Sequence, residues 1–194
     1  MTELEQYIQS YFGVNKEDLA FIASHFKSTQ LQKGEFYLRT GVEAHQLSFV
    51  SDGLLRIYVQ QNDKDITQWI SNKGSFITDL SSFVFDVPAR WNIQALADTQ
   101  LYTIEKKQYR QLGIDLPKWH ALEKLFIAKC FAMLEDRIFS HLSLSAEERY
   151  HFFYQQNKAL FNQVPLQYIA SMLGMTPETF SRIRKKALAT DKSS

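Results

Sequence analysis

The sequence predicts an α+β fold in three successive parts. These are an N-terminal β-roll of the double-stranded β-helix or jelly-roll type with flanking helices, a long helix, and a C-terminal helix-turn-helix domain of the winged-helix type. Three observations predict them: short alternating strands with polar turns from 28 to 104, an unusually long helical pattern at 117–143, and two helical patterns flanking a glycine turn within 166–187. The predicted domains are residues 1–113, 114–144 and 145–194.

Composition places the chain among ordinary globular proteins. Of its 194 residues, 45% are hydrophobic and 22% are charged, which is typical of a packed core and not of a disordered chain. The single cysteine, Cys130, excludes an intramolecular disulfide, a four-cysteine zinc site and a cysteine-ligated iron–sulfur cluster, and we expect a packed thiol. The acidic, amphipathic N-terminus does not resemble a signal peptide, and no stretch reaches the roughly 20 apolar residues that span a bilayer. We therefore expect a cytoplasmic protein without a membrane partner.

The roll is predicted from alternation and turns. Leu55, Ile57 and Val59 alternate with more polar residues after the turn at 51–53, which is typical of a half-buried strand. Helical spacing of apolar residues predicts two helices before the roll. The expected segments are helices at 2–11 and 16–26, strands at 46–50, 66–70, 91–97 and 100–104, and a short helical turn at 78–85.

Two helices are predicted after the roll. The first runs from Lys106 to Leu112, where Gly113 ends it, and the second covers 117–143 with Pro117 in its first turn. A helix of that second length spans about 40 Å and carries apolar residues on more than one side. One face can cover the roll while another pairs with a second copy of the chain. The alternative is a helix buried within one chain, but a helix this long would overhang a small domain, which favours dimerisation.

The formal net charge of +1 conceals an asymmetry along the chain. Residues 164–194 hold five basic and two acidic residues, a net charge of +3, whereas the first 163 residues carry a net charge of −2. Such an asymmetry indicates an anionic partner for the C-terminal region, although a basic cluster can also be a solvated helix end. The five basic residues are Arg182, Arg184, Lys185, Lys186 and Lys192.

The segment Leu166–Arg184 has the pattern of a helix-turn-helix. Ile169 and Leu173, four residues apart, give the first helix a core face, and Ala170 is small where a second helix would cross. Gly174 supplies the permissive backbone that the turn needs.

The second helix of this pattern has a clear start and two faces. Thr176 is suited to the N-cap and Pro177 to the first helical position, while Phe180 and Ile183 point back to the core. The outer surface is then left to Glu178, Thr179, Ser181, Arg182 and Lys185.

A helix of this kind can enter the major groove of DNA with its N-terminal residues facing the base edges. Arg182 could donate to guanine O6 and N7, and Glu178 could accept from cytosine N4. The alternative is that these two residues, four apart, form a surface ion pair. The predicted phosphate contacts are Gln167, Thr179, Ser181, Lys185 and Lys186.

With a long helix and a β-roll ahead of this element, the chain resembles the Crp/Fnr family of bacterial transcription regulators over nearly its full length. The segments 32–36 (Gln-Lys-Gly-Glu-Phe) and 49–56 (Phe-Val-Ser-Asp-Gly-Leu-Leu-Arg) resemble the opening of the family's cyclic-nucleotide-binding roll, and 169–182 resembles its DNA-reading element. The resemblance implies base contacts at Glu178 and Arg182 and a dimer helix at 117–143. Some members carry another base-reading side chain where Pro177 stands, so the operator sequence is not implied.

The resemblance departs from the family pattern at the effector pocket, where Gly74, Ser75, Phe76 and Arg90 are the candidates. Nucleotide-binding members follow a glycine with a glutamate that holds the ribose hydroxyl, and Ser75 stands in that place here. They also present an arginine to the cyclic phosphate, a position that falls on Ala89 with Arg90 one residue out of register. A site without both contacts loses ligand recognition, so this degenerate cassette disfavours a cyclic nucleotide and no cofactor is expected.

These observations predict a homodimeric, DNA-binding transcription regulator that reads a palindromic site through the helix at 177–187. DNA and RNA polymerase are the expected partners, with an unidentified small effector in the roll or none. The alternative is a small-molecule-binding or protein-interaction roll that does not bind DNA. The five histidines lack paired ligand spacing and no nucleophile–base constellation is present, so neither a metal site nor an enzyme is predicted. The chain ends shortly after the second helix, so no wing strand is expected there.

Overall fold

The computed structural model describes residues 1–191, and in this part of the chain eight strands form two four-stranded antiparallel sheets. The strands are β1 (Lys27–Leu31), β2 (Phe36–Leu38), β3 (Gln46–Asp52), β4 (Leu55–Gln61), β5 (Lys64–Ser71), β6 (Phe76–Ile77), β7 (Asn92–Ala95) and β8 (Thr99–Glu105). One sheet has the order β1-β8-β3-β6 and the other β2-β7-β4-β5, so β5 is an edge strand. The last three residues of the predicted C-terminal domain, including Lys192, lie outside the described residues.

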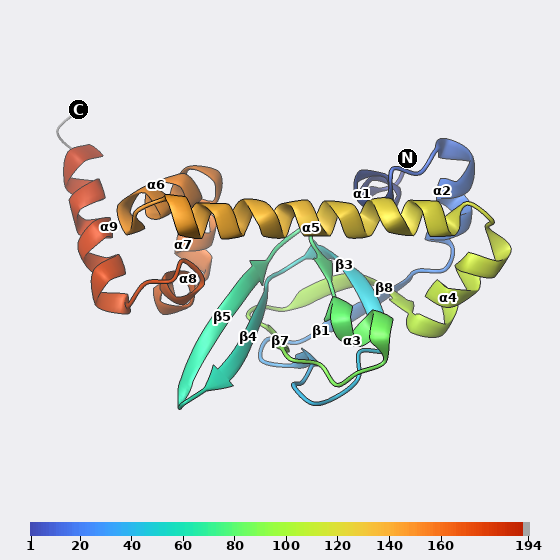
Figure 1. The fold of residues 1–194 in the computed structure, drawn as a ribbon, viewed down its shortest axis with the longest axis horizontal. Coiled ribbons are helices and arrows are strands. Elements are labelled where there is room, and N and C mark those ends of the chain that lie inside the picture. Colours follow the sequence, from blue (N-terminus) through green and yellow to red (C-terminus); the bar gives the residue numbers. More distant parts are fainter. Residues whose placement is uncertain (192–194) are drawn as a thin grey trace.

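The helices surround the roll and extend beyond it. They are α1 (Glu3–Phe12), α2 (Lys16–Ala23), α3 (Leu80–Phe85), α4 (Lys106–Asp115), α5 (Trp119–Ser143), α6 (Ala146–Gln156), α7 (Leu160–Gln163), α8 (Leu166–Met172) and α9 (Pro177–Asp191). Figure 1 shows α5 lying across the sheets, with α1, α2 and α4 near one of its ends and α6–α9 at the other. The predicted α+β class, an antiparallel roll followed by C-terminal helices, is confirmed.

The core of the roll includes aromatic residues from distant segments. Phe12 of α1 stacks on Trp119 and Phe126 of α5, with ring centroids 5.1 and 4.6 Å apart. Phe76 of β6 meets the Phe126 ring edge-on, so the sheet, the N-terminal helix and the long helix share one core. This packing fixes α5 on the roll.

Several predicted segment ends differ from the structure, two of them by three residues. The helix expected at 16–26 ends at Ala23, where the amide of Ser24 donates to Ala20 and the chain turns into β1. Gly113 does not end the helix that contains it, because α4 continues to Asp115. A β-carbon at Gly113 would lie 2.9 Å from the ring of His120, so the glycine permits a close approach between α4 and α5.

Helix α5 starts two residues later than predicted and has two apolar faces. Pro117 lies before the helix, and Trp119 and Phe126 are buried against the roll. A stripe made of Ile127, Phe131, Leu134 and Ile138 is exposed on another side, and we call it the α5 stripe.

The C-terminal helices have a second core of their own. Tyr150 of α6, Phe161 of α7 and Phe180 of α9 pack together with ring centroids 5.4–6.0 Å apart. Ser145 and Glu148 form a capping box at the start of α6. Two residues of the roll, Leu54 and Ile70, join this second core. No strand follows β8 in residues 1–191, so this part of the chain holds no wing strand. No described helix is both long and apolar enough to cross a bilayer.

Candidate functional site

The turn between α8 and α9 is closed by the hydrogen bonds of a Schellman motif. Gly174 has a φ of +69°, and its amide donates to the carbonyl of Ser171 at 3.0 Å. The amide of Met175 donates to the carbonyl of Ala170 at 2.9 Å, and the Met175 side chain is buried. Because a left-handed glycine ends one helix and redirects the chain at once, α9 begins only three residues later.

Helix α9 has the cap and the two faces that the sequence predicts. The amide of Thr179 donates to the Thr176 hydroxyl at 3.2 Å, and Pro177 is the first helical residue. Phe180 and Ile183 are buried in the second core, as are Ile169 and Ala170 of α8. Glu178, Ser181 and Arg182 of α9 lie away from this core and are exposed.

Most predicted DNA-contact residues lie on exposed positions. Glu178, Ser181, Arg182, Lys185, Lys186 and Gln167 are exposed, whereas Thr179 is half-buried and its hydroxyl lies 3.3 Å from that of Thr176. Lys186 of α9 forms an ion pair with Glu147 of α6 at 2.8 Å, which links these two helices.

Glu178 remains ionised at neutral pH. Its own backbone amide, and then the Thr176 hydroxyl, hold the pKa of the Glu178 carboxyl below its usual range. Among the described residues no ion pair joins Glu178 to Arg182, so the surface ion pair considered as an alternative is not formed. Both side chains are thus available to accept from and donate to a partner.

The α5 stripe has the spacing of a coiled-coil seam. Its residues follow one another at intervals of four, three and four, which is the spacing of a and d positions. Ile127 directly follows buried Phe126, so the stripe starts about 100° round the helix from the face that covers the roll. Phe131 is 59% exposed and Ile138 is 50% exposed.

Two of the candidate effector-pocket residues, Ser75 and Phe76, contact other side chains of the protein. The Ser75 hydroxyl donates to the Asn72 side chain at 3.3 Å, and Phe76 packs on Tyr11 and Phe126. Arg90 is exposed. This hydrogen bond of Ser75 and these ring contacts of Phe76 do not reach Arg90, and the effector pocket stays a prediction.

A carboxylate that sequence reasoning missed lies beside Arg90. Asp79 is 5% exposed and caps α3, where one oxygen accepts from the amide of Ser82 at 3.1 Å. The other oxygen accepts from the amides of Arg90 and Trp91 at 2.9 and 3.4 Å. An acidic residue directly before a helix is an ordinary N-cap signal, so the cap could have been predicted; the bonds to the distant loop could not.

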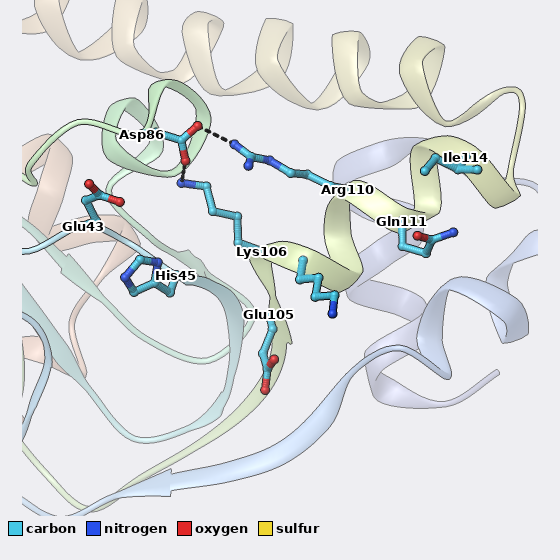
Figure 2. A pocket seen from close by; sticks show the side chains of 9 residues that line it. Glu43, His45, Asp86, Glu105, Lys106, Arg110, Gln111 and Ile114 are labelled. Carbon is cyan, nitrogen blue, oxygen red and sulfur yellow. Dashed lines mark hydrogen bonds and ion pairs between the residues drawn. The ribbon is translucent and has the colours of Figure 1, made fainter.

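The far end of α3 is held by a second carboxylate. Asp86, at φ 55°, pairs with Lys106 at 2.6 Å and with Arg110 at 2.7 Å. Lys106, then Arg110, hold the pKa of the Asp86 carboxyl below its usual range. Figure 2 shows this cluster beside Glu43 and His45, in a hollow that carries charges of both signs. Carboxylates therefore hold both ends of α3: Asp79 at its start and Asp86 at its end.

Metal and thiol chemistry find little support in the described residues. Nowhere in residues 1–191 do three histidine, cysteine or acidic side chains come together to hold a metal ion. Cys130 is half-buried on α5, and burial raises the pKa of its thiol to about 11, so the thiol stays protonated at neutral pH.

Residues 28–113, which run from β1 into α4, match the family model of the cyclic nucleotide-binding domain. No curated protein matches the chain.

Solved structures resemble the chain over most of its length. The structure of FixK2 from Bradyrhizobium japonicum is 18% identical with a TM-score of 0.71, and the match covers 86% of each chain. The c-di-GMP-responsive global regulator CLP of Xanthomonas campestris is 16% identical with a TM-score of 0.65, covering 91% of this chain and 93% of that one. The catabolite activator protein of Thermus thermophilus is 21% identical with a TM-score of 0.57, covering 96% and 88%. At these identities the likeness establishes the shared fold of roll, long helix and C-terminal helices.

Proposed function

We propose that the chain is a DNA-binding transcription regulator of the Crp/Fnr type, that it acts without catalysis as a cytoplasmic homodimer, and that α8 and α9 are its helix-turn-helix. The observation that carries this proposal is the construction of α9. Its Thr176 cap and Gly174 turn set its start, Phe180 and Ile183 anchor it, and Glu178 and Arg182 project from its outer side near the N-terminus. This is the end of a reading helix that faces base edges.

The base contacts fall to Glu178 and Arg182. An ionised Glu178 accepts a hydrogen bond from a cytosine amino group, and the Arg182 guanidinium donates two bonds to a guanine. Gln167, Thr179, Ser181, Lys185 and Lys186 hold phosphates and fix the register. Lys186 exchanges its exposed pair with Glu147 for a phosphate at little cost.

The α5 stripe pairs with the same stripe of a second copy. A seam of Ile127, Phe131, Leu134 and Ile138 removes these side chains from water, and a two-fold axis presents two copies of α9 to successive turns of a palindromic site. The half-sites then lie about 34–36 Å apart. RNA polymerase is the partner through which a bound regulator acts on transcription.

Cyclic nucleotides are not the effector in this proposal. The loop amides of Arg90 and Trp91, next to the position where nucleotide-binding members present their phosphate-binding arginine, already bond to Asp79. A phosphate that bound to these amides would have to displace the buried Asp79 carboxylate. Binding would then be opposed by the repulsion between two negative charges and by the loss of the hydrogen bonds that Asp79 accepts. Calorimetry with cyclic AMP, cyclic GMP and c-di-GMP tests this: we expect no binding at micromolar concentrations, and micromolar binding of any of the three refutes it.

The function is tested by selecting bound DNA from a random library with the full chain. We expect an inverted repeat whose half-sites are one helical turn apart, and affinity that falls as salt rises because phosphate contacts release counterions. Recovery of no enriched sequence, with weak and sequence-independent binding at every salt concentration, contradicts the proposal and favours a roll that does not bind DNA.

A further inference from the structure

The β4–β5 hairpin docks on α8, the first helix of the proposed reading element. Since β5 is an edge strand, the backbone groups on its outer side have no strand partner. The Ser171 hydroxyl of α8 meets two of them: it accepts from the amide of Thr67 at 2.9 Å and donates to the carbonyl of Asp65 at 3.3 Å. Figure 1 shows α8 beside the upper part of the hairpin.

A buried arginine extends this contact. Arg56 of β4 is 3% exposed, and its guanidinium donates to Asp65 at 2.9 Å and to the Thr67 hydroxyl at 3.0 Å. The same guanidinium lies 4.2 Å from the ring of Tyr58 in the roll and 3.6 Å from the ring of Tyr168 in α8. The more polar face of this half-buried strand is therefore covered at Arg56 by α8.

A second arginine joins the hairpin and α8 to the dimer helix. Arg137 of α5 donates to the carbonyl of Gln68 in β5 and to the carbonyl of Met172 in α8, the latter at 3.2 Å. Its guanidinium also lies 5.3 Å from the ring of Trp69. No described carboxylate forms an ion pair with Arg137. The hydrogen-bond partners of its guanidinium are backbone carbonyls of β5 and α8. Arg137 directly precedes Ile138 of the α5 stripe.

The hairpin also forms one wall of a cleft beside the DNA-contact residues. Lys64, Asp65 and Ile66 line this cleft of about 690 Å³ on one side. Gln167 and Glu178, a proposed phosphate contact and a proposed base contact, line it on the other. Movement of the hairpin would therefore change the surroundings of the reading surface.

We propose that Arg137 and the β4–β5 hairpin form an interdomain clamp that fixes α8 and α9 at one angle to the dimer helix, and that Arg137 is the positioning residue that sets the half-site spacing. The inference rests on the proposed function. Apart from the clamp, α5 is connected to α9 by the link at Leu144 and Ser145 and by helices α6 to α8, and Leu54 and Ile70 of the roll pack in the second core. The clamp adds hydrogen bonds from α8 to the hairpin through Ser171 and to α5 through the Met172 carbonyl, and these hold the reading helix at one angle to the seam.

The clamp can be tested without DNA through hydrogen exchange at the Thr67 amide. This amide donates to Ser171 and not to a strand, so its protection reports docking of the hairpin on α8. We expect exchange at Thr67 to become at least about 10-fold faster in R137M and in Y168L, approaching the rate in S171A, which lacks the acceptor. The matched control is R39M, which removes an exposed arginine stacked on Phe36 in the roll and should leave Thr67 unchanged. Unchanged exchange in both R137M and Y168L overturns the clamp.

The spacing is tested with palindromes whose half-sites are moved apart or together by one to three base pairs. The wild-type chain should prefer one spacing by at least about 10-fold, and R137M should lose that preference while keeping its preference for the half-site sequence; R137K should restore part of it. If R137M keeps the wild-type spacing preference, Arg137 does not set the angle. If the wild-type chain selects no DNA, the proposed function fails, and the Thr67 exchange still decides whether the clamp exists.

Discussion

Removing the carboxylate of Asp79 should weaken the roll by an amount that its contacts define. In D79A the amides of Ser82, Arg90 and Trp91 lose their acceptor at 3.1, 2.9 and 3.4 Å. Hydrogen bonds to a charged group contribute about 1.5–3 kcal/mol each, but the longest of the three is weak and an exposed loop can admit water. We therefore expect a loss of about 3 kcal/mol, or roughly 6–12 °C in the melting temperature for a chain of this size.

The substitution D79N distinguishes the cap of α3 from the hydrogen bonds to the loop at Arg90 and Trp91. An asparagine carbonyl can still accept from Ser82 and cap α3, but its amide group would face the donors of Arg90 and Trp91. D79N should therefore fall between wild type and D79A. The control D98A removes an exposed carboxylate that accepts one amide, that of Lys33 at 2.9 Å, and should cost less than about 1 kcal/mol.

Thermal unfolding followed by circular dichroism measures these differences, and added formate or acetate tests the chemistry. A small carboxylate should enter the vacancy in D79A and recover part of the lost melting temperature, whereas chloride at the same ionic strength should not. A melting temperature within 2 °C of wild type in D79A would refute the view that the Asp79 carboxylate stabilises the roll by accepting these three hydrogen bonds. Equal recovery by chloride would refute the view that the position requires a carboxylate.

Three further predictions concern the dimer, the Asp86 carboxylate at the end of α3, and the second core. F131E should convert the dimer to a monomer in light scattering because it places a charge in the α5 stripe, while L125E, at an exposed position outside the stripe, should remain dimeric; a dimeric F131E would exclude this seam. Since the pKa of Asp86 is lowered on folding, its contribution to stability is fully present above its ordinary value of 3.8 and is lost as pH falls from there through the lower pKa of the folded state. D86N should thus lower the melting temperature by less at pH 2.5 than at pH 7, and equal losses at both would contradict this. A170L should destabilise the C-terminal helices by about 1–3 kcal/mol in urea unfolding, because Ala170 is fully buried between α8 and its neighbours; an unchanged midpoint would show that space exists there.

Local signals in the sequence were sufficient for the helix ends of the C-terminal region. Thr176 with Pro177, and Ser145 with Glu148, act within one turn of chain, so their caps could be predicted from neighbours alone. The burial of Phe180 and Ile183 followed from helical spacing in the same way. The helix end predicted at Gly113 was wrong because a glycine can also allow two helices to approach closely. Only the position of the His120 ring shows which role this glycine has.

Contacts between distant segments were beyond the sequence pattern. Ser171 and Thr67 are 104 residues apart, and nothing local to either indicates that they meet. Arg56 alternates along β4 as a surface residue would, yet the docked α8 buries it. The sequence pattern points to Ser75 and Arg90 in the effector region, whereas the carboxylate that accepts from the loop amides is that of Asp79.

The most direct test of sequence reading by α9 is a binding titration on the selected site with R182A and R184A. Both variants remove one positive charge from the same helix, but Arg184 is half-buried and has no proposed base contact. At fixed salt, R182A should lose discrimination at one base pair of each half-site, about 1–3 kcal/mol or roughly 5–150-fold, while R184A keeps it. Unchanged discrimination in R182A, or equal loss in both variants, would contradict the account.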